Sequence, residues 1–119
     1  MRITDAAAVE GVNKALAHGG ATHSYSDVLN RISCGRAQLW EGENAILVSE
    51  IHNMPLKRVL HFWLATGTLA DVVRLSDDAL AWAKSLGISE ATMTGRRGWE
   101  RALADKGWKP MLTTMGREI

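Results

Sequence analysis

The sequence has one cysteine, two prolines, one phenylalanine and one tyrosine among its 119 residues, and little net charge. Because Cys34 is alone, the chain has neither a disulfide framework nor a cysteine metal cluster, which fits a reducing cytoplasm. Its 14 basic and 13 acidic side chains give a net charge of +1. Nucleic-acid-binding domains usually carry a strongly basic surface, so we do not expect nucleic acid as the main partner.

Long apolar runs are also missing. A membrane-spanning helix needs about 20 consecutive apolar residues, whereas the apolar stretches here are short, such as Phe62 to Ala65. The first residues, Met1 to Asp5, include charged side chains and lack the apolar segment of a secretory signal. We therefore expect no membrane partner and a cytoplasmic protein.

The composition instead indicates a single globular domain over residues 1–119. Hydrophobic residues make up 46% of the chain and charged residues 23%, which is close to the average of globular proteins. Tryptophan is unusually frequent, with five residues. We expect Trp63, Trp82, Trp99 and Trp108 to meet on one face of a sheet, with Trp40 apart in a hairpin.

Apolar residues at helical spacing predict three main helices. The first follows Thr4 and ends at His18, and its interior Gly11 costs about 1 kcal/mol relative to alanine. The second runs from Ser26, as N-cap, to Ile32. The third covers residues 68–86, with a predicted break at Ser76, whose hydroxyl can cap a second helical segment.

Five other segments have strand-like composition, being rich in β-forming residues or bounded by glycine. The last of them contains Pro110, which places it at a sheet edge or after a bulge. These segments cover residues 36–40, 45–51, 57–65, 88–94 and 108–115, with a helix over 99–106 before the last.

The third of these strands should be central, because both of its faces are apolar near its end. Alternation places Val59, His61 and Trp63 on one face, and Phe62 and Leu64 on the other. The connection to the fourth strand is about 20 residues long, enough for a parallel, right-handed crossover. The expected fold class is therefore α/β, or α+β with a mixed sheet: a central mixed sheet with helices on both faces.

The turn after the third strand is a candidate binding site, because open sheets bind ligands at the carboxyl ends of parallel strands. It reads Leu64, Ala65, Thr66, Gly67, Thr68, Leu69, Ala70. The element order and this turn resemble the GNAT superfamily of acyl-CoA-dependent N-acetyltransferases. This resemblance implies a GNAT-like fold, with the pyrophosphate of acetyl-CoA bound by Leu64, Ala65, Gly67, Thr68 and Leu69.

The alternative is a purely structural turn. Gly67 matches the glycine of the superfamily motif, whereas Leu64 and Leu69 depart from it. Thr68 and Asp71 also have the spacing of a capping box. In that arrangement the helix satisfies its own N–H groups and a carboxylate lies where a diphosphate would bind.

A second motif holds two adjacent arginines between glycines, in the order Gly95, Arg96, Arg97, Gly98, Trp99, Glu100. Cations near a helix N-terminus oppose the helix dipole, so this pair is unfavourable for stability alone. We expect Arg96 and Arg97 to bind an anion, which the resemblance would make part of acetyl-CoA. The alternative is that they pair with the carboxylates of Glu90 or Glu100.

Two residues are candidates for accepting a proton from an amine, directly or through water. Glu50 lies at the end of the second strand, and His61 lies in the third. The alternative for His61 is a hydrogen-bonded core histidine. The remaining histidines lack metal-ligand spacing with acidic residues, so we expect no metal site.

Residues 55–65, together with the Gly-Arg-Arg-Gly-Trp motif, resemble a group of small phage-encoded GNAT-like proteins over about residues 45 to 119. The resemblance leaves two functions open. The first is an acyltransferase that moves an acetyl group from acetyl-CoA to an amine, with a protein among the candidate acceptors. The second is a catalytically inactive GNAT-fold phage protein that acts as a virion or host-interaction component, in the host cytoplasm or in the virion.

Overall fold

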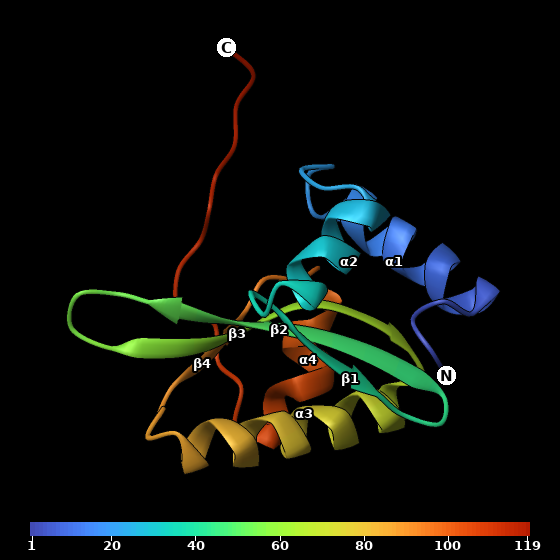
Figure 1. The fold of residues 1–119 in the computed structure, drawn as a ribbon. Coiled ribbons are helices and arrows are strands. Elements are labelled where there is room, and N and C mark those ends of the chain that lie inside the picture. The colour runs from blue at the N-terminus through green and yellow to red at the C-terminus, as the bar shows by residue number, and fades with distance from the viewer.

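The computed structural model describes all residues from Met1 to Ile119 (Figure 1). Two helices come first, three strands follow, and the chain then continues as helix, strand and helix, an order close to the predicted one. Along the chain they are α1 (Ala6–His18), α2 (Tyr25–Ser33), β1 (Gln38–Glu41), β2 (Ala45–Asn53), β3 (Arg58–Gly67), α3 (Leu69–Ser85), β4 (Ala91–Met93) and α4 (Gly98–Leu103), followed by a 3₁₀ turn (Ala104–Lys106).

The four strands form one mixed sheet in the order β1-β2-β3-β4. The first three pair antiparallel, and β4 pairs parallel to β3 after the crossover helix α3. Helices α1 and α2 cover one face of the sheet and α3 covers the other (Figure 1). The predicted class, a central mixed sheet with helices on both faces, is confirmed, and β3 is central as predicted.

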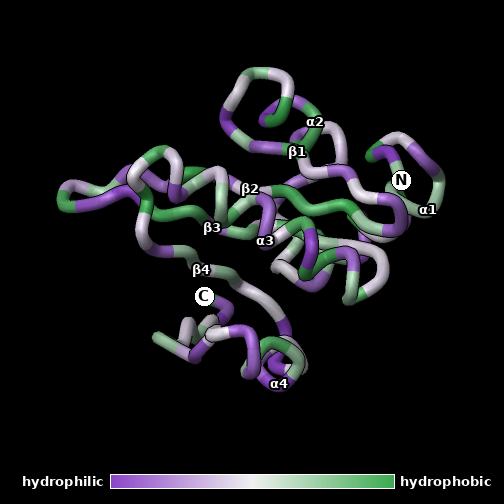
Figure 2. Tube along the Cα trace, turned by 90° about the horizontal axis from the view of Figure 1, so that it is seen from below, coloured by the Kyte–Doolittle hydropathy of each residue, from purple (hydrophilic) through white to green (hydrophobic).

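Each face of the sheet has its own apolar core. On the α1/α2 side, Val12 and Val28 belong to the same buried cluster as Ile46 of β2. On the α3 side, Leu75 and Ala79 belong to the cluster that includes β3 residues. Figure 2 shows hydrophobic stretches of β2 and β3 running through the middle of the molecule. Burial on both faces explains why these strands lack a clean polar alternation.

A β-bulge in β3 changes which side chains share a face. Phe62 lies opposite Ser49 of β2, and the next pair joins Leu64 to Val48, so Trp63 is an extra residue. Consequently Trp63 and Leu64 both pack on the α1/α2 side, whereas Phe62 belongs to the core on the α3 side. The predicted alternation is therefore wrong for Leu64, because a bulge shifts the period by one residue.

The tryptophans also divide differently from the prediction. Trp40, Trp82, Trp99 and Trp108 all pack against the core on the α3 side, and the rings of Trp40 and Trp82 meet edge to face at 5.7 Å. Trp63 packs on the opposite face. Four tryptophans do gather on one face, but Trp40 belongs to that group and Trp63 does not.

Two helix details differ from the sequence prediction because hydroxyl groups find other partners. Helix α3 has no break, since Ser76 donates its hydroxyl to the carbonyl of Val73 at 2.7 Å inside the helix. Helix α2 is capped by Ser24 rather than Ser26, and Ser24 and Asp27 form a reciprocal capping box. The Ser24 hydrogen bonds also hold the pKa of the Asp27 carboxyl below its usual value.

The predicted last strand, over residues 108–115, is absent. The chain after Gly107 is extended but makes no backbone hydrogen bond to the sheet. Its one anchor is Trp108, whose ring lies 5.6 Å from that of Phe62. Strand β4 is likewise shorter than the predicted 88–94, because its pairing with β3 covers only Ala91 to Met93. None of the helices combines the length and apolar character needed to cross a membrane.

Candidate functional site

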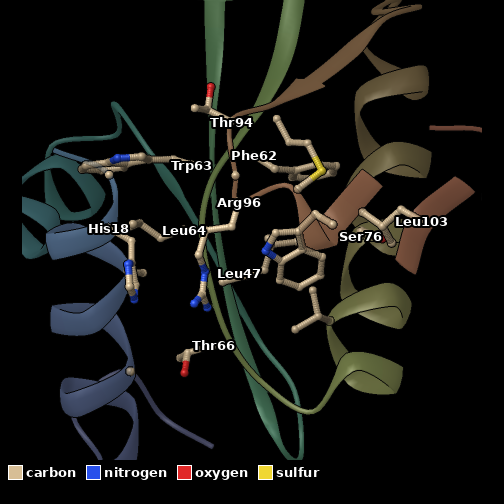
Figure 3. Close-up of a pocket in the computed structure, with 18 of the residues that line it drawn as sticks. His18, Leu47, Phe62, Trp63, Leu64, Thr66, Ser76, Thr94, Arg96 and Leu103 are labelled. Carbon is tan, nitrogen blue, oxygen red and sulfur yellow. The ribbon is translucent and has the colours of Figure 1, made fainter. Parts of the chain in front are cut away.

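Strands β3 and β4 pair over only three residues and then separate. The last pair joins Phe62 to Met93, just before the bulge at Trp63. Beyond this point lies a cleft of about 940 Å³. Its walls come from α1, the second half of β3, the first turns of α3 and the segment after β4 (Figure 3). The cleft therefore lies at the carboxyl ends of two parallel strands, where open sheets bind ligands.

The lining of the cleft combines two kinds of chemistry. Much of it is apolar, including Leu47, Phe62, Leu64, Val72 and Leu103. Four lining residues are basic and none is acidic; the basic ones are Lys14, His18, Arg96 and Arg97. This combination suits a ligand that has an apolar part and a negatively charged part.

Arg96 occupies a central place in this cleft. Figure 3 shows its side chain extending into the opening between α1, which carries His18, and α3, which carries Ser76. A guanidinium in this position presents several N–H donors to a bound anion, in the geometry that suits phosphate and carboxylate oxygens.

Neither Arg96 nor Arg97 forms an ion pair. Glu90, one of the expected partners, pairs with Lys57 instead, and Glu100 pairs with neither arginine. The alternative that these arginines form structural ion pairs is therefore wrong. Their charge is left available to a ligand in the cleft.

The turn after β3 packs against the β1–β2 loop and is hydrogen-bonded to it. Gly67 has a φ of 116°, and a Cβ atom there would lie 2.1 Å from the carbonyl oxygen of Asn44. The N–H of Thr68 donates to the same carbonyl at 3.0 Å. Glycine is required at this position both by the positive φ and by the close approach of the loop.

The predicted capping box at this turn forms only in part. The Thr68 hydroxyl accepts from the N–H of Asp71 at 3.4 Å, but the Asp71 carboxylate does not return the bond. It accepts from the N–H of Asn44 at 2.5 Å and pairs with Arg74. Asp71 is buried and is not among the residues that line the cleft. The carboxylate expected to repel a diphosphate is therefore turned away from the cleft.

The residues predicted to bind acetyl-CoA are brought together in part. Thr68 and Leu69 do not line the cleft. The other predicted residues line the cleft: Leu64, Ala65, Gly67, Arg96 and Arg97. Sequence reasoning missed the α1 wall, including Lys14 and His18, because no local pattern shows that this helix lies over the end of β3.

A glycine lets α1 form that wall. A Cβ atom at Gly11 would lie 1.9 Å from Oγ1 of Thr66, so only glycine allows the helix to come this close to β3. The cost of glycine inside a helix, about 1 kcal/mol relative to alanine, is thus explained by the packing that positions Lys14 and His18 beside the cleft.

The two candidate proton acceptors lie beside the cleft rather than in its lining. His61 and Glu50 are direct partners across β2 and β3, on the face covered by α1 and α2. Nδ1 of His61 lies 2.8 Å from Oγ1 of Thr92 on β4, and His52 stacks on His61 with ring centroids 4.7 Å apart. The His61–Thr92 pair is the one immediately before the final strand pair.

The environment of His61 favours its neutral form. Burial, and next the neighbouring His52, lower the pKa of His61 below its ordinary value, while Glu50 opposes this effect. Its imidazole is therefore uncharged at neutral pH and has a lone pair that can accept a proton. The alternative, a hydrogen-bonded core histidine, is met only in part: the hydrogen bond to Thr92 forms, but His61 is half-buried among polar side chains and belongs to neither apolar core.

Glu50 is engaged with other side chains. Its Oε2 accepts from Nε and Nη2 of Arg31 at 3.0 and 2.5 Å, and its Oε1 lies 3.4 Å from Nε2 of His52. Both oxygens of the Glu50 carboxylate therefore already have partners within the protein. The polar group of Arg31, Glu50, His52, His61 and Thr92 was not foreseen, because strand register and the packing of α2 bring its members together.

No protein-family model and no curated protein matches this sequence. Solved structures nevertheless share its fold. A predicted acetyltransferase from Clostridium acetobutylicum, solved with acetyl-CoA, has a TM-score of 0.67 at 9% identity, covering 99% of this chain and 92% of that one. The fold is therefore the one expected from the GNAT resemblance.

Two further structures with this fold carry no named activity. A tetramutant of the BH1408 protein of Bacillus halodurans has a TM-score of 0.69 at 12% identity, covering 95% of this chain and 91% of that chain. A point mutant of TTHA1254 from Thermus thermophilus has a TM-score of 0.63 at 14% identity, covering 99% and 95%. Identities this low establish a common fold and leave the function to the site.

Proposed function

We propose that the protein binds acetyl-CoA, or a related acyl-CoA, in the cleft between β3 and β4 and transfers the acyl group to an amine. The observation that carries this proposal is the combination of an apolar lining with four basic and no acidic residues. An acyl-CoA has the matching properties, since its acyl arm is largely uncharged and its phosphates are anionic. The fold shared with a predicted acetyltransferase solved with acetyl-CoA supports the proposal.

The separation of β3 from β4 provides space for the uncharged chain that carries the acyl group of such a ligand. Beyond Phe62, β3 still pairs with β2 but has lost its partner on the other side. Its backbone N–H and C=O groups on that side are free to pair with amide groups of a ligand, as an added strand would. The phosphates would then lie near Arg96, Arg97 and Lys14, which line the cleft.

Proton transfer is assigned to His61 rather than to Glu50. Acetyl-CoA, when bound, supplies an activated acyl group that an amine can attack once the amine loses a proton. In the tautomer that carries its proton on Nδ1, His61 donates to Oγ1 of Thr92, and Nε2 keeps the lone pair that accepts the proton of the amine, directly or through water. Glu50, held by Arg31, positions His52 against His61.

A paired binding and turnover measurement tests this function. Acetyl-CoA should raise the melting temperature of the wild-type protein, and the His61→Asn variant should show the same shift because His61 lies outside the cleft lining. Thiol release in the presence of polyamines, aminoglycosides and lysine peptides should be lost in the variant. No shift at millimolar acetyl-CoA, with the protein folded, would contradict the proposal.

The second candidate is a catalytically inactive protein of the same fold that acts through a protein partner, such as a virion or host-interaction component. The observation that favours it is the exposure of Met111, Leu112 and Met115, which lie 63%, 94% and 90% exposed after the last helix. Absence of thiol release with every acceptor, together with co-purification with phage particles, would support this candidate over the enzyme.

A further inference from the structure

Residues 109–119, which we call the arm, leave their backbone hydrogen-bonding groups unpaired and several apolar side chains exposed. They are extended, and no hydrogen bond joins them to the rest of the protein. Besides Met111, Leu112 and Met115, the arm exposes Ile119 completely. In Figure 1 the arm runs out past the sheet and ends beyond the layer of α1 and α2. An apolar segment in this state is normally covered by something.

The outer edge of β4 is open as well. Strand β4 is the last strand of the sheet and pairs with β3 alone. At the start of this strand lies a groove of about 450 Å³, formed by the end of α3, the segment that leads into β4 and the first residue of β4. Its apolar lining residues are Leu60, Leu80, Ala83, Ile88 and Ala91. An open strand edge next to an apolar groove is a ready template for one more strand.

We propose that the arm of one copy of this chain pairs with the β4 edge of a second copy as a fifth strand. Side chains two apart along a strand share a face, so Met111 and Met115 can enter the groove together while Leu112 and Thr114 face the other way. Pro110 cannot donate a backbone hydrogen bond, but an added edge strand uses its donors on one side only.

A second copy is the occupant that the structure favours, because each chain carries one arm and one open edge. The arm leads away from its own β4 (Figure 1). Fully extended, its eleven residues span about 36 Å, against a radius of gyration of 14.1 Å for the whole chain. In a twofold pair each arm can therefore reach the edge of the partner, which gives a closed, self-complementary interface.

Light scattering coupled to size-exclusion chromatography tests this arrangement. The Cys34→Ser variant is the reference, since the exposed Cys34 could otherwise link copies by a disulfide. We expect a dimer for the full chain and a monomer with an unchanged circular dichroism spectrum for a chain that stops after Lys109. Met115→Asp should shift the equilibrium toward monomer at least tenfold, whereas the matched Thr114→Asp should shift it much less.

Three results would overturn the proposal. A full, uncleaved chain that stays monomeric at the highest attainable concentration would do so. A dimer that persists after removal of the arm would show that another surface forms the interface. Equal effects of Met115→Asp and Thr114→Asp would exclude an ordered strand in the groove. None of these results depends on binding of an acyl-CoA.

Discussion

The structure decides between two interpretations of Arg96 and Arg97. The sequence left open whether they bind an anion or pair with local carboxylates. Glu90 is occupied by Lys57, and neither arginine has an acidic partner. A guanidinium without a partner contributes little to folding, but it forms a strong charge-assisted hydrogen bond once a ligand excludes water around it.

Replacing Arg96 with alanine should therefore weaken acetyl-CoA binding while leaving stability nearly unchanged. The loss of one charged hydrogen bond corresponds to about a tenfold increase in Kd, and Arg97→Ala should act in the same direction. Calorimetric titration measures Kd and thermal unfolding measures stability. Arg101→Ala is the matched control, because Arg101 is exposed on α4 and does not line the cleft. If Arg96→Ala lowered stability without lowering affinity, the assignment would be contradicted.

The environment of His61 predicts how the free energy of unfolding depends on pH. Burial and His52 lower its pKa in the folded state, so the unfolded chain binds more protons once the pH falls below about 6.5. The free energy of unfolding should therefore be highest above that pH and decrease as the pH falls toward about 5.

The His61→Asn variant should lose part of this pH dependence, because asparagine does not titrate. Urea denaturation at about pH 7.5 and about pH 5 gives the two free energies for each protein. His18→Asn is the control, since His18 is exposed and lies on α1. The assignment fails if His61→Asn and the wild type lose equal free energy on acidification.

At the scale of the elements, a bulge and a close helix contact build the cleft. The extra residue Trp63 in β3 follows directly after the last pair with β4, and Gly11 lets α1 approach Thr66. Neither feature leaves a local mark in the sequence. A strand that is apolar on both faces has the same composition with or without an extra residue. A glycine inside a helix indicates only a lower helix propensity.

Gly11→Ala should destabilise the protein, although alanine is the better helix former by about 1 kcal/mol. The new Cβ would overlap Oγ1 of Thr66, so α1 must shift and the core beneath it must loosen, at a cost of about 1–3 kcal/mol. Gly98→Ala in α4 is the matched control, because its Cβ position faces open space beyond the local backbone. Chemical denaturation that finds Gly11→Ala as stable as Gly98→Ala would show that the contact is unimportant.

The elements that sequence reasoning found are those with strong local periodicity. Helices α1 and α3, the three antiparallel strands and the parallel crossover to β4 all follow from apolar spacing and connection length. The partner of Asp71 could not be found in this way, since its carboxylate turns from the expected capping position to Asn44, 27 residues earlier. The predicted last strand is absent for another reason: composition does not show where a segment leads, and residues 108–115 run away from the open edge of their own β4 without pairing with it.

At the scale of the whole molecule, the candidate site is made by parts far apart in the chain. Lys14 comes from α1, Leu64 from β3 and Arg96 from the segment after β4. Sequence reasoning identified the β3 turn and the arginine pair as separate candidates, and the fold places them on opposite walls of one cleft. The α1 wall and the polar group around His61 emerge only from tertiary packing.

The most direct measurement is a titration of the ¹⁵N-labelled protein with acetyl-CoA, followed by amide chemical shifts. Binding in the cleft should move the resonances of residues 63–67 and 93–97 and of the end of α1, and leave the β2–β3 turn at Pro55 unchanged. Shifts confined to other surfaces, or no shifts at millimolar ligand, would show that the cleft is not an acyl-CoA site.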